Sequence, residues 1–511
     1  MIIIGAGIGG LTCGAMLAQA GKKVLVCEQH SQPGGYVTSF SRQGFTFDGG
    51  LQSLASNGLI FPILRELGLW DRLRFVRARY QLITPDINLK LSSLAQVKEG
   101  FKQAFPLAQD EVEAYFGELD RLLVPFAEIF GGNKVAPALL SDSEKTRAVA
   151  FRDKANISFL RELVRYQKMS SLDLINKYVT DRRLKYILAA IGYPVMSVVN
   201  TVGMWYSFLQ DYWYPLGGMQ NLANLITELV RGNGGEVVLG SRVARILTEN
   251  GAVTGVRLAG GSKILSQFVV SNADWRQTFT RLTDRSYFDQ EFIAGIEKGK
   301  VSDTMFCVYL GTDLAPSSLA GLAHHVYYFP SYGRHFLEKD IDAPDFFEDC
   351  MVSIALTSLS DASLAPEGKS VITITSFAPY EYRGRWQTGG SGRSSGAYRK
   401  LKERVAQQLV AIAEGVIPEL SQHILVREVA TPLTYERYTL NSEGASVGWS
   451  WDPAYADTGR YRTSLGWPET PIKNLFTCGH WCYPPGGVPT AMLTARTVAN
   501  MIEKGSIEES K

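Results

Sequence analysis

The chain has 511 residues, of which 45% are hydrophobic and 20% charged, and its formal net charge is +2 at pH 7. These values exclude a disordered chain, give no support for a nucleic-acid partner and leave room for two domains. The six cysteines include no Cys-x-x-Cys pair, so we expect no disulfide framework and no metal site, and a reducing compartment.

The first 28 residues carry the clearest pattern. Ile2–Ile4 predicts a buried strand, and Gly5-x-Gly7-x-x-Gly10 follows it at once and opens a helix over residues 11–20. A second strand at 24–27 ends on Glu28, 18 positions after Gly10. This strand–helix–strand context predicts a dinucleotide site, and a glycine-rich unit without a ligand is the alternative.

Each residue of this pattern has a physical task. Gly5 permits the tight turn, Gly7 lets the backbone approach a pyrophosphate, and Gly10 lets the helix pack closely on the strand. The helix N-terminus offers free N–H groups to the phosphates, and Glu28 is placed to accept hydrogen bonds from a ribose.

A second glycine pair, Gly34-Gly35, follows, and Phe45–Gly50 is typical of a strand that ends in a tight turn. At these residues the chain resembles the family of FAD-containing amine oxidases and phytoene desaturases, whose members carry this fingerprint, a Gly-Gly pair and a Phe-Asp-x-Gly segment. The resemblance implies FAD in an extended pose, with its isoalloxazine ring at a domain interface. It also implies an α/β fold, in which a Rossmann-like FAD-binding domain carries an inserted α+β substrate domain.

The order of the motifs divides the chain into five alternating parts. We predict that residues 1–85, 214–290 and 439–511 form the FAD-binding domain, and that residues 86–213 and 291–438 form the substrate domain. Helices are expected at 60–67 and 110–130, with an extended stretch at 82–92 between them.

Two neighbouring segments bear on membrane contact. Residues 145–185 carry eleven positive and four negative charges with apolar residues between them, which suits an anionic membrane surface or a solvated helical face. Residues 186–210 carry no charge, but Gly192 and Pro194 interrupt them. We therefore expect a buried helix pair that lines an apolar cavity, and not a transmembrane span.

The middle of the chain contains further segments that resemble cofactor-binding parts of the family. Tyr214–Gly218 resembles the family's Tyr-Pro-x-Gly-Gly turn before a helix, here expected at 222–231. The family residue that matches Val243 binds adenine through its backbone, and residues 268–274 resemble the strand that ends beside the cofactor. Further strands are expected at 304–309 and 371–376, a loop at 389–396 and a helix at 400–416. Residues 431–438 resemble the Thr-Pro-x-Thr-x-Glu-Arg-Tyr/Phe segment of carotenoid desaturases and isomerases.

The closing motif repeats the opening one. Residues 475–480 predict a strand entering a turn, and residues 484–489 lead into a helix over 490–502, whose N-terminus in the family faces the flavin's pyrimidine end. Where the family has Asp, this chain has His480, which is a catalytic candidate or a packed imidazole. The cofactor-binding residues that we predict are Gly5, Gly7, Gly9, Gly10, Glu28, Gln29, Gly34, Gly35, Gly50, Val243, Asn272, Ala273, Gly479, His480, Gly487, Val488 and Met492.

The resemblance implies an FAD-dependent oxidoreductase that acts on a hydrophobic polyene such as a carotenoid. Desaturation is our main expectation, and cis–trans isomerisation or saturation are alternatives on the same scaffold, with a non-catalytic lipid-binding escort protein as an alternative of another class. Quinone or oxygen is the expected electron acceptor. Because the chain begins with a strand and has no basic leader, we expect a cytoplasmic protein that associates peripherally with a membrane.

Overall fold

We describe a computed structural model of the chain, in residues 1–130, 165–333, 340–389, 395–452, 470–483 and 486–508. A five-stranded parallel sheet, in the order β10-β2-β1-β14-β20, carries the two terminal motifs. Its strands are Glu236–Val238 (β10), Leu25–Cys27 (β2), Ile2–Ile4 (β1), Val269–Ser271 (β14) and Leu475–Thr477 (β20). The strands are short and mostly buried, as expected for a parallel sheet that is covered on both faces.

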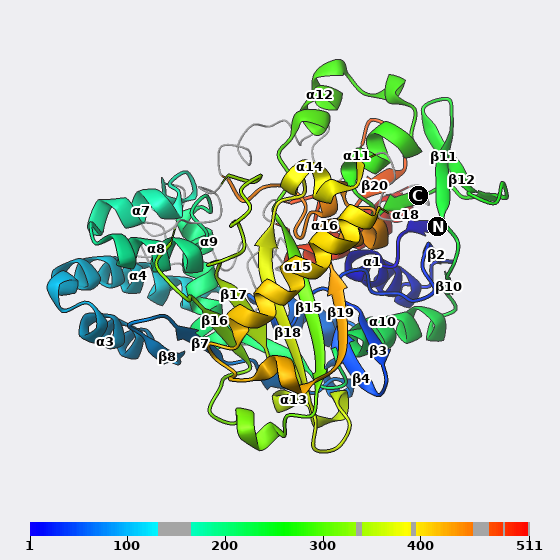
Figure 1. Cartoon of the computed structure of the whole chain (residues 1–511). Coiled ribbons are helices and arrows are strands. Elements are labelled where there is room, and N and C mark those ends of the chain that lie inside the picture. The colour runs from blue at the N-terminus through cyan, green and yellow to red at the C-terminus, as the bar shows by residue number, and fades with distance from the viewer. Residues whose placement is uncertain (131–164, 334–339, 390–394, 453–469, 484–485, 509–511) are drawn as a thin grey trace.

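Three helices pack around this sheet, in the region that holds both chain ends in Figure 1. They are α1 (Ile8–Gln19), α10 (Met219–Gly232) and α18 (Val488–Glu508), and α1 packs against the other two. Because α1 consists largely of small residues that are buried on every side, its neighbours can approach closely. The predicted Rossmann-like α/β unit is therefore confirmed, with each element close to its expected place.

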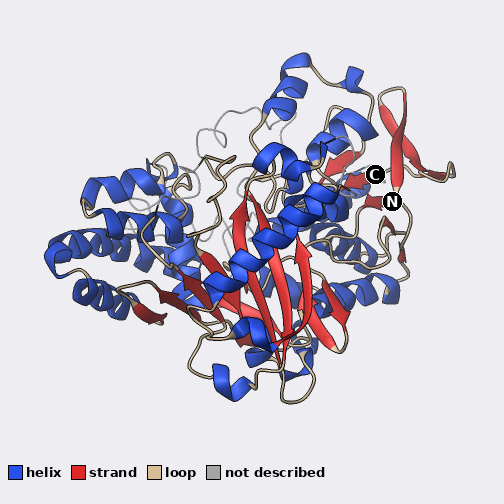
Figure 2. Cartoon of the chain, viewed as in Figure 1, coloured by secondary structure: helices blue, strands red, loops and turns tan. Residues whose placement is uncertain are grey.

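A second, seven-stranded sheet lies at the centre of the molecule, in the order β19-β15-β18-β17-β16-β7-β8 (Figure 2). Its strands are Ile424–Ala430 (β19), Thr304–Thr312 (β15), Ser370–Ala378 (β18), Val352–Ala355 (β17), His325–Tyr328 (β16), Tyr80–Ile83 (β7) and Asn88–Leu91 (β8). The expected extended stretch at 82–92 is thus a hairpin, since β7 and β8 pair with each other around a turn at 84–87. The predicted domain boundary at residue 85 falls within this turn.

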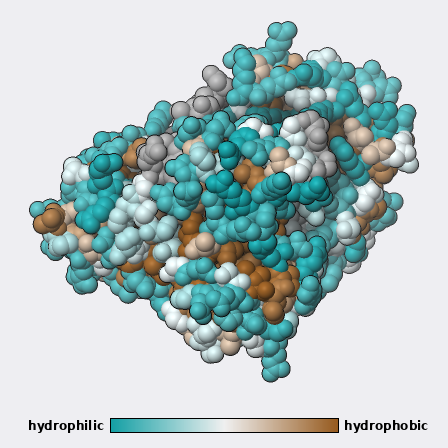
Figure 3. All heavy atoms as spheres, in the orientation of Figure 1, coloured by the Kyte–Doolittle hydropathy of each residue, from teal (hydrophilic) through white to brown (hydrophobic). Residues whose placement is uncertain are grey.

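The two faces of this sheet have different neighbours, because side chains alternate along a strand. Phe306, Val308 and Leu310 of β15 pack in one core with Leu401 and other residues of α15 (Gly396–Ala413), which crosses the sheet in Figure 1. Cys307 and Tyr309 instead join the core of the FAD-binding unit on the opposite face. In Figure 3 the view with α15 in front is mainly hydrophilic, with hydrophobic side chains gathered near its middle.

A helical lobe at the other end of the seven-stranded sheet contains α3 (Leu94–Ala104), α4 (Gln109–Phe130), α7 (Ser171–Tyr178), α8 (Arg182–Gly192) and α9 (Val198–Tyr206). The helix pair expected from the uncharged segment is present as α8 and α9. Its side chains form the core of this lobe with those of α4, so the expectation that the pair lines a cavity receives no support. Within the described ranges, no helix has the length and apolar character needed to cross a bilayer.

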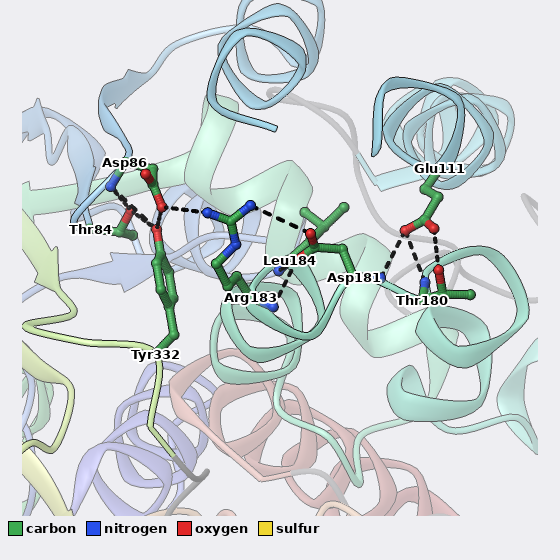
Figure 4. Close-up of polar contacts among 8 residues, drawn as sticks. All are labelled: Thr84, Asp86, Glu111, Thr180, Asp181, Arg183, Leu184 and Tyr332. Carbon is green, nitrogen blue, oxygen red and sulfur yellow. Dashed lines mark hydrogen bonds and ion pairs between the residues drawn. The ribbon is translucent and has the colours of Figure 1, made fainter. Parts of the chain in front are cut away.

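Polar contacts fasten this lobe to the seven-stranded sheet (Figure 4). Asp181 caps α8 by accepting the N–H groups of Arg183 and Leu184 at 2.8 and 3.0 Å, and the Arg183 guanidinium lies 3.4 Å from Asp86 in the β7–β8 turn. Asp86 also accepts the Tyr332 hydroxyl at 2.6 Å. Part of the basic segment, residues 145–164, lies outside the described residues, and in the remainder Arg183 binds within the protein.

Smaller elements complete the fold. Two hairpin strands, Ser39–Arg42 (β3) and Phe45–Asp48 (β4), pair with each other, and Val243–Glu249 (β11), Ala252–Leu258 (β12) and Lys263–Leu265 (β13) form a three-stranded sheet. Leu54–Ala55 (β5), Tyr212–Pro215 (β9) and Phe75–Arg77 (β6) form another. In the described part of the chain, the remaining α-helices are Ile60–Glu66 (α2), Trp275–Gln277 (α11), Gln290–Lys298 (α12), Thr357–Ser360 (α13), Tyr382–Gln387 (α14) and Pro432–Thr439 (α16).

Candidate FAD and substrate site

The site begins where four parallel strands of the five-stranded sheet end side by side. Ile4, Cys27, Ser271 and Thr477 occupy the same level in the register of β1, β2, β14 and β20. In open α/β sheets, ligands bind outside the carboxyl ends of the strands. The residues that follow these ends are Gly5, Glu28, Asn272 and Cys478-Gly479, so local sequence order delivers most of the predicted site to one edge.

A cavity of about 790 Å³ lies beyond this edge and reaches the facing side of β15 and β19. Predicted residues that line it are Gly5, Gly7, Gly9, Glu28, Gln29, Gly34, Gly35, Gly50, Val243, Asn272, Ala273, His480, Gly487 and Val488. The other three predicted residues, Gly10, Gly479 and Met492, do not line the cavity. Met492 is fully buried in α18, and Gly479 donates its N–H to Thr494 Oγ1 at 2.9 Å.

The glycines at this edge leave no room for side chains. A Cβ on Gly10 would overlap the carbonyl oxygen of Gly5, and one on Gly9 would lie 2.6 Å from Asn272 Oδ1 and 3.0 Å from Gly479 Cα. Gly7 lines the cavity and has no side chain to cover its backbone. Such a cradle fits a pyrophosphate, which the backbone N–H groups bind at close range.

The polar groups at the cradle also suit a dinucleotide. No side chain caps the start of α1, so its first N–H groups and partial positive charge face the cavity at Gly7 and Gly9. α18 begins at Val488, which lines the same cavity. The Glu28 carboxylate accepts the N–H groups of Ala6 at 2.7 Å and His30 at 2.9 Å, and it retains acceptor capacity for ribose hydroxyls. These residues fit FAD.

Two family motifs that are far apart in the sequence meet at Asp48. Its carboxylate accepts the Tyr214 hydroxyl at 2.5 Å and the Met219 N–H at 2.8 Å, and burial raises the pKa of this carboxyl. Asp48 thereby supplies the acceptor at the N-terminus of α10, where Gly218 has a φ of 82°. Gln220 of the same helix donates to Pro33 O at 2.9 Å and so holds the loop of the second glycine pair.

Four tyrosines that line the cavity bond to the protein through their hydroxyls. Tyr309 donates to Gly49 O at 2.7 Å, and Tyr435 donates to Cys307 Sγ at 2.9 Å. Tyr36 donates to Ala445 O at 2.9 Å, and the Tyr398 hydroxyl lies 3.0 Å from Thr431 Oγ1. With the hydroxyls engaged in this way, the side chains offer aromatic surface to an apolar ligand.

Sequence reasoning did not select these tyrosines. The one available signal was Tyr435, which lies inside the motif at 431–438. Tyr309 and Tyr435 touch across 126 positions of sequence, with their hydroxyls 3.1 Å apart, and the contact depends on how α16 packs on β15.

His480 lies at the cavity wall, partly exposed, with its ring 6.3 Å from that of Tyr36 and 5.7 Å from that of Trp481. Desolvation lowers the pKa of this imidazole to about 4. His480 is therefore neutral near pH 7.

A comparison with protein families decides the assignment. The model of the flavin-containing amine oxidoreductase family matches residues 8–502. The chain belongs to this family. As a flavin-containing amine oxidoreductase family member it is an FAD-dependent enzyme, which confirms the predicted cofactor and oxidoreductase class and removes the non-catalytic escort alternative.

Three curated relatives have nearly the same sequence identity to this chain. The chain is 25% identical to a lycopene-forming phytoene desaturase of Pseudescherichia vulneris, over 98% of both chains. It is 26% identical to the chloroplastic prolycopene isomerase of Daucus carota, over 95% of this chain and 77% of that protein. It is 25% identical to the all-trans-retinol 13,14-reductase of Danio rerio, over 94% and 82%.

Solved structures have a fold similar to that of this chain. An oxidoreductase from Methanosarcina mazei superposes with a TM-score of 0.59 at 17% identity, over 98% of this chain and 99% of that one. A putrescine oxidase bound to putrescine gives a TM-score of 0.62 at 13% identity, over 98% of both chains. These likenesses confirm the fold class.

Proposed function

We propose that this enzyme carries out FAD-dependent redox chemistry on a long hydrophobic polyene, with carotenoid desaturation as the first candidate reaction. The observation that carries the proposal is the wall of tyrosines whose hydroxyls are bonded to the protein. A substrate with polar groups would gain little from such a wall, whereas a hydrocarbon needs only apolar contact and the exclusion of water. The end-to-end match to polyene-metabolising relatives supports the same substrate class.

The roles of the residues follow from their places in the cavity. When bound, FAD supplies a two-electron acceptor or donor of hydride. The glycine cradle and Glu28 would hold its adenosine and pyrophosphate, and the N-terminus of α18 would offset negative charge at its ring. The rings of Tyr309 and Tyr435 would orient the polyene and keep water away.

His480 is the proposed proton acceptor of the site. Its neutral imidazole lies in the cavity wall, and general acid–base groups contribute on the order of 100- to 10,000-fold to a rate. We expect His480→Ala to lower turnover by about 100-fold or more while the purified protein keeps its flavin absorbance. Equal loss of flavin and activity would instead assign His480 a purely cofactor-binding role.

Expression in a polyene-making host tests the reaction. We expect a yellow purified protein with the absorbance of oxidised flavin, and the host's pigments, separated by chromatography, should shift toward longer conjugated systems. A need for stoichiometric electron acceptor would support desaturation, and turnover with catalytic reductant alone would support isomerisation. Unchanged pigments beside a flavin-loaded protein would refute the proposed substrate class.

We also propose that the enzyme works at a cytoplasmic membrane surface, where a polyene dissolves, and passes its electrons to quinone or oxygen. The helical lobe supports this with Leu107, which is 100% exposed in the short turn Pro106–Ala108 before α4, and with Val124, which is 54% exposed on α4. Flotation with anionic vesicles measures binding, and Leu107→Ser should weaken it. Retention of full binding by this variant would place the contact elsewhere.

A further inference from the structure

A row of side chains on the cavity-facing side of the seven-stranded sheet leads away from the cavity. Strand register places Tyr309, Thr373, Ala355, His325 and Tyr80 at one level on β15, β18, β17, β16 and β7. Residues directly opposite one another in paired strands share a face of the sheet. The rings of His325 and Tyr80 stack at 4.8 Å, as this arrangement requires.

The loop at 49–53 runs across these strands above the row. At the cavity end, Tyr309 donates its hydroxyl to Gly49 O at 2.7 Å. At the other end, the Ser53 hydroxyl lies 2.7 Å from that of Tyr80, and Ser53 is partly exposed. Between these points, Gln52 O lies 2.9 Å from Nε2 of His324, which neighbours His325.

Three buried polar atoms on residues of this row and of the loop find no hydrogen-bond partner in the described protein: His325 Nδ1, Thr373 Oγ1 and Gln52 Oε1. Their side chains are 7%, 1% and 7% exposed. Buried polar groups in native proteins are nearly always bonded, and ordered water is the usual partner where protein groups do not reach. In the register of the sheet, Ala355 lies between His325 and Thr373, and its side chain is a single methyl group.

We propose that the loop at 49–53 and this row enclose a file of bound water molecules that connects the cavity wall at Tyr309 with the Tyr80–Ser53 pair and carries protons between the cavity and solvent. The proton-carrying part depends on the proposed function, because oxidation of adjacent C–H bonds releases a proton along with each hydride. Along the file, each oxygen accepts one proton and passes on another, so one O–H bond forms and one breaks at every step. His325 suits this path because burial keeps its pKa well below the usual value and the ring stays neutral.

A crystal structure of the FAD-loaded protein, at a resolution that shows ordered water, tests the file without any substrate. We expect water oxygens within hydrogen-bond distance of His325 Nδ1, Thr373 Oγ1 and Gln52 Oε1. Failure of the polyene reaction would leave this result unaffected. Protein partners on these atoms, or a dry space between them, would overturn the proposal.

Two variants test the transport of protons. Ala355→Val adds two methyl groups between His325 and Thr373 and should displace water. Thr373→Val removes one hydroxyl at nearly constant shape and replaces the first variant if that one does not fold. For each we expect retained flavin absorbance, the loss of at least one water and a larger ratio of turnover in H₂O to turnover in D₂O. Thr312→Val on the opposite face, where Oγ1 donates to Ser370 O at 3.2 Å, is the matched control and should change neither readout. Lost water with an unchanged isotope ratio would refute the conducting role.

Discussion

At the scale of single residues, the proposed FAD-binding part of the cavity depends on glycines, which have no side chain. The α-carbon of Gly10 faces the carbonyl oxygen of Gly5, and no rotation relieves the overlap that a methyl group would create there, because the obstacle is backbone. Any side chain must therefore displace the first strand or α1, and with it the N–H groups that form the cradle.

We predict that Gly10→Ala raises the dissociation constant for FAD at least tenfold, which a loss of about 1.4 kcal/mol of binding free energy produces, and so lowers the flavin content of the purified protein. The ratio of flavin to protein absorbance measures it. Gly117→Ala in α4 is the control, because nothing lies within 4 Å of the added methyl group. A normal flavin content in Gly10→Ala would contradict the close packing described for this turn.

Buried histidines make stability depend on pH. Desolvation lowers the pKa of His324 to about 4 from an ordinary value near 6.5. Between these values the unfolded chain binds a proton that the folded chain excludes, so the free energy of unfolding falls as the pH drops from about 6.5 toward 4. Melting temperatures across this range should show the loss, and His324→Gln should flatten the slope while lowering stability at pH 7. An unchanged slope in that variant would exclude His324 as a source.

The predictability of residues follows the range of their contacts. Gly5, Gly7, Glu28 and Gly34 could be selected from sequence because their tasks depend on neighbours within one strand–helix–strand unit. Tyr309 could not, because it becomes a cavity residue only when β15 pairs between β18 and β19 and shows its odd-numbered side chains to the FAD-binding unit.

At the scale of elements, the start of α10 depends on a residue from another segment. The helix has a glycine at its N-cap and no side-chain cap there, and Asp48 on β4 accepts the Met219 N–H instead. The same carboxylate accepts hydroxyls from Ser39 at 2.6 Å and Tyr214 at 2.5 Å. A buried acceptor with three donors stabilises the junction of two motifs that the sequence shows only as separate turns.

We predict that Asp48→Ala destabilises the folded protein by about 3 kcal/mol, because removal of one partner leaves buried donors unpaired at about 1 to 3 kcal/mol each. Asp48→Asn should cost less, since its amide oxygen still accepts one of these bonds. Denaturant unfolding followed by circular dichroism measures both. The exposed Asp313→Asn serves as control, and equal stability of Asp48→Ala and the control would refute this account.

Elements were predicted correctly where one hydrophobic periodicity runs through the whole segment. They were predicted wrongly where a turn or a contact with another element determines the structure. The long apolar period over 110–130 gave α4 almost to the residue, from Gln109 to Phe130. The stretch 82–92 looked continuous, yet Thr84 accepts the N–H groups of Asp86 and Ile87 and so turns the chain between β7 and β8. For 186–210, the absence of charge indicated burial correctly, but the side chains pack into the core of the helical lobe, whereas the prediction placed them around an apolar cavity.

At the scale of the whole molecule, the cavity is built from segments that lie far apart in the sequence. Residues 5–50, 242–277, 428–447 and 480–491 all contribute to its lining. Two helix N-termini with partial positive charge, those of α1 and α18, face the same space, and each repels the other until an anion lies between them. FAD therefore stabilises the junction of all these segments at once.

Removal of FAD should consequently lower the stability of the whole protein. A ligand that binds only the folded state adds about 2.7 kcal/mol to the free energy of unfolding at 100 times its dissociation constant. We expect the apoprotein to melt at a lower temperature, with faster amide hydrogen exchange in the first 35 residues and in α18 together, although they lie at opposite ends of the chain. Added FAD should restore both, and AMP, which lacks the flavin, should restore protection at residues 5–28 and leave α18 exchanging. If α18 stayed equally protected with and without FAD, packing of α1 on α18 would suffice to hold the two motifs together.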